Sequence, residues 1–199
     1  MIVVTGTPGT GKTKFSRLLA RRIEATHIDI GRIALSEGLT IGTDVHRKSQ
    51  IADVLKVSAW IRKRFGEIDG DIVIEGHYAS MVVPKRPVQL VIVLRCDPHE
   101  LIRRLRKRRM PRKKILENVA AEALDVCLID SLKSFGRKKI CEMDTTQKTL
   151  KSVLMETLRV LDGRTKPRFG NVDWLGRLEE RGELDALMSF QRPNCGRRS

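Results

Sequence analysis

The stretch VVTGTPGTGKT, residues 3–13, leads from a β-branched run into a segment with three glycines, a lysine and a threonine. From Gly6 to Thr13 its spacing matches G-x-x-x-x-G-K-[S/T], a phosphate-binding loop that follows a strand and opens a helix. In such a loop, backbone N–H groups and the helix N-terminus face phosphate oxygens. The Lys12 ammonium can neutralise the outer phosphates, and the Thr13 hydroxyl can ligate Mg²⁺. The stretch therefore predicts a site for a triphosphate.

The segments after the loop alternate between strand and helix patterns. Short β-branched runs predict strands at 1–5, 26–30, 71–75, 88–95 and 139–143. Apolar residues at helical spacing predict helices at 12–23, 49–65, from 98 onward, at 115–132 and at 150–161. Continuous apolar strands are typical of sheets buried on both faces. We therefore predict an α/β P-loop NTPase fold, with a five-stranded, mostly parallel sheet flanked by helices.

Two acidic residues end predicted strands, at the edge where ligands bind in open parallel sheets. Glu75 follows the apolar run 71–74 and is the favoured metal-holding carboxylate, whereas Asp29 could equally form a turn. His77 follows Glu75 by two positions and could orient an attacking water or a phosphate, or could be a surface histidine. The remaining histidines have no comparable placement: His27, His46 and His99.

Residues 103–114, RRLRKRRMPRKK, hold nine lysines and arginines between two predicted helices. Phosphate transfer gathers many negative oxygens, so it requires cations that close over the site and exclude water. Arg104 and Arg108 lie four residues apart on one helix face and can reach the same point. The cluster therefore predicts a short lid, although any single arginine in it could belong to a solvated basic face.

The chain of 199 residues is long enough for one well-packed domain. Its 39 Lys and Arg against 24 Asp and Glu give a formal net charge of +15, which favours nucleotides, nucleic acids or acidic proteins as partners. The cysteines lack C-x-x-C spacing, so we expect free thiols rather than a metal site: Cys96, Cys127, Cys141 and Cys195. We find no signal peptide or membrane-spanning run and expect a soluble cytoplasmic protein.

The composition changes after residue 161, where Gly, Pro, Arg and Asn become frequent. Apolar residues in this part recur in two groups, Trp174, Leu175 and Leu178, then Leu184, Leu187 and Met188. We expect residues 162–199 to form a basic, partly helical extension. It could be a helix pair docked loosely on the core, which is the favoured reading, or an arm that binds a partner.

Several motifs occur in the order found in a known family: TGTPGTGKT, EGHYAS, VLRCDP, RLRKRRMPRKKILENVAAEALDV and CEMDTT. On these motifs, residues 1–161 resemble the small, atypical adenylate kinases, the sixth group of that family, whose eukaryotic members are nuclear and whose archaeal members are similar in size. The resemblance implies transfer of phosphate from ATP to a nucleoside monophosphate, usually AMP, with accompanying ATP hydrolysis and Mg²⁺ as cofactor.

By position, the resemblance implies ATP contacts from Gly9, Gly11, Lys12, Thr13, Lys14 and Arg108. It implies catalytic roles for Lys12, Glu75, His77 and Arg108, and metal binding by Thr13 and Glu75. It assigns the monophosphate-binding region to about 30–53, the lid to about 107–117 and the adenine neighbourhood to 144–146. The family often has a glycine and an aromatic residue after the lid arginine, where this chain has Arg109 and Met110.

The same family is associated with late maturation of the small ribosomal subunit, through rRNA processing and binding of a platform ribosomal protein. The charge of +15 fits such partners, because a kinase of free nucleotides gains little from a basic exterior. Two alternatives stay open. One is an ATP-dependent assembly switch whose kinase activity is incidental, and the other is a P-loop kinase of another small metabolite.

Overall fold

The computed structural model describes residues 1–44 and 49–185. Five parallel strands form its central sheet in the order β2-β5-β1-β6-β7. They are β1 (Ile2–Thr5), β2 (Thr26–Asp29), β5 (Ile72–Glu75), β6 (Leu90–Arg95) and β7 (Ile140–Asp144). The predicted α/β fold with five parallel strands is confirmed, and each strand lies within one or two residues of its predicted bounds.

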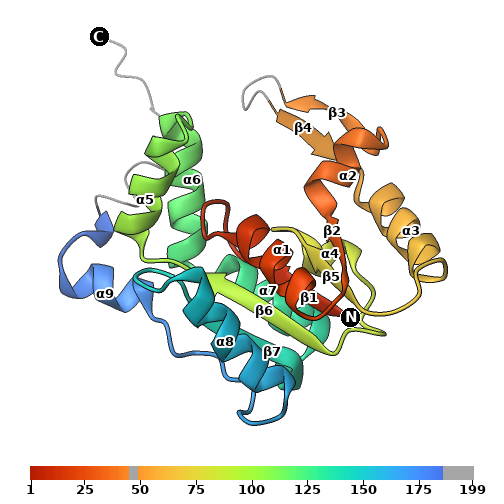
Figure 1. Cartoon of the computed structure of the whole chain (residues 1–199). Helices are drawn as coiled ribbons and strands as arrows, with labels where there is room; N and C mark the ends of the chain where they lie inside the picture. The colour runs from red at the N-terminus through yellow and green to blue at the C-terminus, as the bar shows by residue number, and fades with distance from the viewer. Residues whose placement is uncertain (45–48, 186–199) are drawn as a thin grey trace.

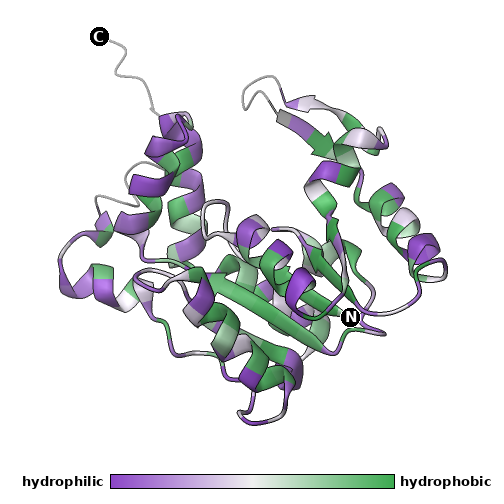
Figure 2. Cartoon of the chain, in the orientation of Figure 1, coloured by the Kyte–Doolittle hydropathy of each residue, from purple (hydrophilic) through white to green (hydrophobic). Residues whose placement is uncertain are grey.

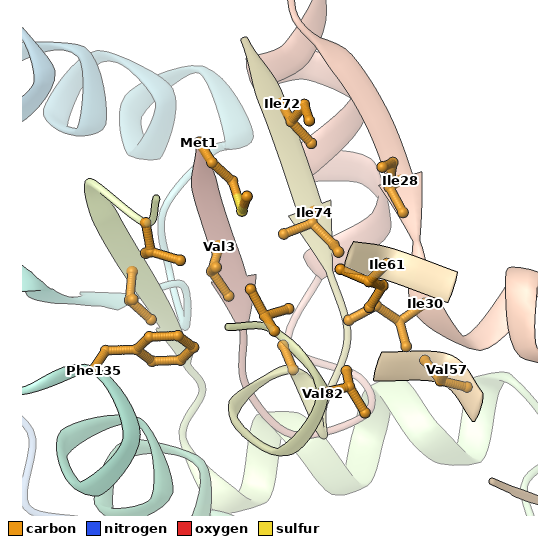
Figure 3. Packing of buried hydrophobic residues seen from close by; sticks show 14 of the residues in the cluster. Met1, Val3, Ile28, Ile30, Val57, Ile61, Ile72, Ile74, Val82 and Phe135 are labelled. Carbon is orange, nitrogen blue, oxygen red and sulfur yellow. The ribbon is translucent and has the colours of Figure 1, made fainter. Parts of the chain in front are cut away.

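Helices cover both faces of this sheet, which explains why β1, β5 and β6 are buried along their whole length (Figure 1). One face packs against α3 (Val54–Phe65), α4 (Ala79–Val82) and α7 (Val126–Phe135). Figure 3 shows this layer, in which Val3 and Ile74 of the sheet lie among side chains from these helices. The strands are therefore buried by helices rather than by a second sheet.

The opposite face packs against α1 (Lys12–Arg22) and α8 (Leu150–Leu161). Val4 and Ile92 point to this side, because successive strand residues face opposite ways. The result is a three-layer α/β/α domain. Strand β6 of the central sheet is hydrophobic in Figure 2, whereas the outer sides of the flanking helices are largely hydrophilic.

A third apolar cluster joins α5 (Pro98–Lys107), α6 (Arg112–Ala123) and α9 (Trp174–Glu180). Leu101 and Leu105 of α5 lie at its centre and are fully buried. In the C-terminal part, Trp174 is 1% exposed, whereas Leu187 and Met188 lie outside the described residues. Within the described range, the chain after residue 161 thus contributes a buried aromatic side chain rather than only surface contacts.

The region between β2 and α3 differs from the prediction. α2 (Ile30–Ser36) leads into β3 (Thr40–Asp44), which pairs antiparallel with β4 (Ser49–Ala52). The prediction of one helix over 49–65 was therefore wrong for its first residues. Ile51 fits the apolar helical stripe of the sequence, yet in the structure it pairs with Gly42 across the hairpin.

The prediction of one continuous helix over 115–132 was also wrong. The chain forms α6 and α7 with a break at Asp125, which has a left-handed backbone with φ of 57°. The Asp125 carboxylate accepts a hydrogen bond from the Arg95 guanidinium, at the end of β6. A short 3₁₀ turn, η1 (Arg137–Lys139), then leads into β7. No helix among the described residues has the length and apolar character needed to cross a membrane.

Candidate functional site

The predicted phosphate loop leaves β1 and turns directly into α1, as its motif requires. Gly6, Gly9 and Gly11 have positive φ values of 136°, 104° and 103°, which side chains rarely adopt. A Cβ atom on Gly6 would lie 2.3 Å from the Leu94 carbonyl oxygen. The first glycine is therefore required by close backbone packing as well as by its φ value.

Lys12 lies at the first position of α1 and reaches back over the loop. Its Nζ donates to the carbonyl oxygens of Gly6 at 2.7 Å and Thr7 at 3.1 Å. Burial lowers the pKa of Lys12, an effect that nearby groups, including Glu75, partly offset. A phosphate group in the loop would offer this ammonium group a charged acceptor in place of two neutral carbonyls.

Glu75 ends β5 beside the loop and is 2% exposed. Its Oε2 accepts from the Thr13 hydroxyl at 3.2 Å, and its Oε1 lies 3.2 Å from Nε2 of His27. Oxygen donors of this kind suit Mg²⁺, so the Thr13 and Glu75 pair fits the predicted metal role. Asp29 instead caps α2, accepting from the Arg32 N–H at 3.0 Å, although it also lines the same cavity.

His77 follows β5 by two residues, lines the cavity beside the loop and is exposed to solvent. Its ring meets the Tyr78 ring edge-on, with 4.8 Å between centroids. Although part of the residue is exposed, the protein around the ring withdraws water from it, and this desolvation together with the nearby Lys12 charge lowers the pKa of His77 to about 4. The imidazole is therefore neutral at physiological pH and can accept a hydrogen bond from a water or a hydroxyl group.

A cavity of about 250 Å³ brings together the residues that the sequence assigned to catalysis, to the ATP phosphates and to the metal. Its walls include the eight predicted site residues Gly9, Gly11, Lys12, Thr13, Lys14, Glu75, His77 and Arg108. These residues come from three separate parts of the chain, namely the loop with α1, the end of β5 and the end of α5.

Two further cavities share lining residues with this phosphate cavity. One, of about 460 Å³, is bounded by Arg104, Lys107, Thr145 and Lys148 and shares Gly9, Gly11, Lys14 and Arg108. The other, of about 600 Å³, is bounded by α2, β3, β4 and α4 and shares Gly31 and His77. The loop thus lies between two larger spaces, and Arg108 borders both the loop cavity and the first of these spaces. This arrangement can hold two ligands with their phosphates toward each other.

The predicted lid occupies the end of α5, the following turn and the start of α6 (Figure 1). Arg104 donates to Glu100 and to the Thr145 carbonyl at 2.8 Å each, so it supports the wall of the first large cavity. Arg104 and Arg108 do line that cavity together. Arg109 has a positive φ of 55°, the conformation that a glycine would supply without strain.

Two polar residues near the site were missed by the sequence reasoning. His27 contacts Glu75, and its place two residues before Asp29 on β2 puts both side chains on one face of the strand, a period-two signal that could have indicated it. Glu122 is a buried carboxylate that accepts a hydrogen bond from Thr7 in the loop at 2.6 Å. No local motif indicated Glu122, because these two residues are 115 positions apart in the chain.

Comparisons with known proteins agree with this geometry. The model of the family described as "AAA domain" matches residues 2–125. A relative from Thermococcus onnurineus, named "Putative adenylate kinase", is 37% identical over 174 residues, covering 87% of this chain and 91% of the relative. One of the same name from Natronomonas pharaonis is 39% identical over 173 residues, covering 87% and 96%.

This chain belongs to the adenylate-kinase-like family. Its fold is also found in more distant small-molecule kinases of known structure. A shikimate kinase from Acinetobacter baumannii, in complex with shikimate, superposes with a TM-score of 0.59 at 14% identity, covering 82% of this chain and 93% of that one. A gluconokinase from Sinorhizobium meliloti gives 0.52 at 17% identity, covering 93% and 96%. As a member of the adenylate-kinase-like family, the chain is a phosphotransferase of the P-loop kinase type.

Proposed function

We propose that this protein transfers the terminal phosphate of ATP to a nucleoside monophosphate, AMP or a related nucleotide, forming two diphosphates. The observation that carries the proposal is that the loop cavity shares lining residues with a larger cavity on either side. The donor base and ribose would lie in the cavity bounded by Arg104, Thr145 and Lys148. The acceptor would lie in the cavity formed within 30–53 and α4, so the phosphates meet at the loop.

Each predicted residue then has a defined task. Loop backbone N–H groups around Gly9 and Gly11 would hold the β-phosphate, and Lys12 and Arg108 would neutralise charge on the transferred group. Thr13 and Glu75 would hold Mg²⁺, which when bound neutralises phosphate charge and aligns the donor. Because phosphate transfer depends mainly on positioning and charge, no covalent intermediate is required.

His77 is proposed to act at the acceptor side. Its ring borders both the loop cavity and the acceptor cavity. Since its low pKa keeps it neutral, it would orient the acceptor phosphate or an attacking water as a hydrogen-bonding group rather than as a cation. Lys14, which borders the donor cavity, would contact the ATP phosphates.

The proposal is tested by measuring ADP formation from Mg-ATP with no acceptor and with AMP, CMP, GMP or UMP in turn. We expect at least one monophosphate to raise the rate well above the acceptor-free rate. Lys12→Ala is expected to abolish turnover, whereas Lys151→Ala, on the exposed side of α8, is expected to leave it unchanged. If none of the four acceptors raises the rate, the kinase proposal fails.

Slow ATP hydrolysis without an acceptor is part of the proposal, since water can attack the terminal phosphate when no monophosphate is bound. Phosphate release in the acceptor-free reaction measures it directly. A kinase of another small metabolite is the alternative, and activity with a polyol or sugar acid but with no nucleotide would favour it.

We further propose a role in late maturation of the small ribosomal subunit, with its rRNA and a platform ribosomal protein as partners. The net charge of +15 and the exposed arginines of the lid region support this proposal, because a basic exterior favours an anionic partner. Recovery of a small-subunit protein or rRNA fragment with and without ATP tests it. Equal recovery in both conditions would argue against an ATP-controlled switch, and no recovery in either would overturn the role.

A further inference from the structure

Glu122 lies near the end of α6, is 1% exposed and uses both carboxylate oxygens. Oε1 accepts from Arg95 Nε at 2.8 Å, from the Cys96 N–H at 3.0 Å and from Trp174 Nε1 at 3.3 Å. Oε2 accepts from the Thr7 hydroxyl at 2.6 Å. One oxygen is therefore anchored to the core and the C-terminal segment, and the other to the phosphate loop.

Thr7 connects this carboxylate to the phosphate-binding groups. Its carbonyl oxygen accepts from Lys12 Nζ at 3.1 Å, and from the Thr10 hydroxyl at 2.9 Å and the Thr10 N–H at 3.2 Å. Thr7 is itself 1% exposed, so its hydroxyl has no alternative partner in bulk water. Hydrogen bonds to charged, buried acceptors are stronger than those between neutral groups. The Glu122 carboxylate thus determines the position of the peptide unit that holds Lys12 and the turn.

The same helix begins at the lid. α6 starts at Arg112, directly after the turn at Arg109, and Glu122 lies ten residues along it, about 15 Å at the rise of an α-helix. The carboxylate that contacts the loop and the segment after the lid arginine therefore belong to the same helix.

We propose that Glu122 is a positioning residue for the phosphate loop, acting through Thr7 to hold the loop and Lys12 in the conformation that binds a triphosphate. The inference rests on the proposed function, because it requires the loop to bind ATP. It predicts that the Thr7–Glu122 bond sets ATP affinity, whereas the bonds on the other carboxylate oxygen set only the stability of the fold.

The test compares two substitutions at Thr7, using the full chain. Thr7→Val keeps the volume and removes the hydroxyl donor, and we expect it to weaken ATP binding, measured by calorimetry, about tenfold or more. Thr7→Ser restores the donor, and we expect affinity within about twofold of the wild type. The Thr7–Glu122 bond holds the loop in the same conformation when ATP binds and when its phosphate is transferred. KM for ATP should therefore rise in Thr7→Val while kcat changes little.

Trp174→Phe provides the matched control, because it removes a donor from Oε1 without touching Oε2. We expect a lower Tm with ATP affinity within about twofold of the wild type, measured at a temperature where all variants are folded. Thr7→Ala replaces Thr7→Val if the latter does not fold, with the same expected loss.

Three outcomes would overturn the inference. ATP affinity that is unchanged in a folded Thr7→Val or Thr7→Ala protein would overturn it while leaving the proposed function intact. Equal loss of affinity in Trp174→Phe would show that Glu122 acts only through general stability. Absence of ATP binding in the wild type would overturn the proposed function and this inference together.

Discussion

At the scale of single residues, the site depends on backbone conformations that only glycine adopts easily and on polar groups held out of water. Gly6 and Gly11 share a positive φ, yet their surroundings differ. A Cβ on Gly6 would meet a backbone oxygen, whereas a Cβ on Gly11 would meet nothing within 4 Å. The motif has glycine at both positions. Gly11 is required only by its backbone conformation, whereas Gly6 is required by its conformation and by its contact with a backbone oxygen.

This contrast gives a prediction for stability. Gly11→Ala is expected to lower the free energy of unfolding by about 1 kcal/mol, from backbone strain alone. Gly6→Ala is expected to cost about 1–3 kcal/mol more, because the Leu94 carbonyl must also move. Urea denaturation of both variants measures the difference. Equal costs would contradict the close packing of Gly6 against β6.

His77 gives a prediction for pH dependence. Its pKa is about 4 in the folded protein and near the ordinary value of 6.5 when unfolded, so the unfolded chain binds more protons between these values. The His77 contribution to stability is therefore present above pH 6.5 and is lost as the pH falls toward 4. His77→Asn is expected to show a smaller loss of stability than the wild type over this range. Urea denaturation at several pH values compares them, and parallel curves would contradict the low pKa.

At the scale of elements, the start of α3 differs from the start that the apolar pattern predicted. Residues 49–52 carry an apolar residue in helical register, but they pair with β3 instead, and α3 begins only after Asp53. The Asp53 side chain accepts from the N–H groups of Leu55 and Lys56 at 3.1 Å each. The capping residue indicates a helix start at residue 54, whereas the apolar pattern indicated a start at residue 49. The structure follows the capping residue.

Asp53→Ala is therefore expected to lower the free energy of unfolding by about 1 kcal/mol, the usual cost of losing an N-cap. Asp53→Asn keeps an oxygen that can accept the same hydrogen bonds, so we expect a much smaller effect. Thermal unfolding of the two variants beside the wild type measures both. An equal loss in the two variants would show that the charge of Asp53 matters rather than its capping bonds.

At the scale of the whole molecule, a buried ion network joins parts of the chain that are far apart in sequence. Arg95 at the end of β6 contacts carboxylates on α6, on β7 and in the break between α6 and α7. Glu142 in turn accepts from the N–H groups of Gly170 and Asn171 at 2.8 and 3.0 Å, which ties the C-terminal segment to β7. Burial opposes the Arg95 charge, but the carboxylates outweigh it and raise the pKa of Arg95.

Removing this single cation would leave the two buried carboxylates, Glu122 and Glu142, without the positive charge that contacts them. Arg95→Met is expected to lower the free energy of unfolding by about 3–5 kcal/mol. Arg103→Ala breaks an exposed ion pair with Glu100 and serves as the control, for which we expect no measurable change. Urea denaturation distinguishes the two, and a stable Arg95→Met protein would contradict the role of the network in holding the C-terminal segment.

The sequence by itself determined the features that depend on neighbouring residues. The phosphate loop follows from the spacing of Gly6, Gly11 and Lys12, and the buried strands follow from continuous β-branched runs. The direction of the strands also predicted that Glu75 lies at the carboxyl edge of the sheet, where in the structure it lines the loop cavity. These patterns involve residues that are close together in the sequence, so they can be recognised without the structure.

Only the tertiary structure decided the features that depend on contacts between distant residues. The pairing of β3 with β4 and the break at Asp125 each require a partner that no local pattern identifies. The Thr7–Glu122 bond is a further case, because it joins residues 115 positions apart. A buried polar group must find a hydrogen-bond partner in the fold, and which partner it finds depends on how the layers pack.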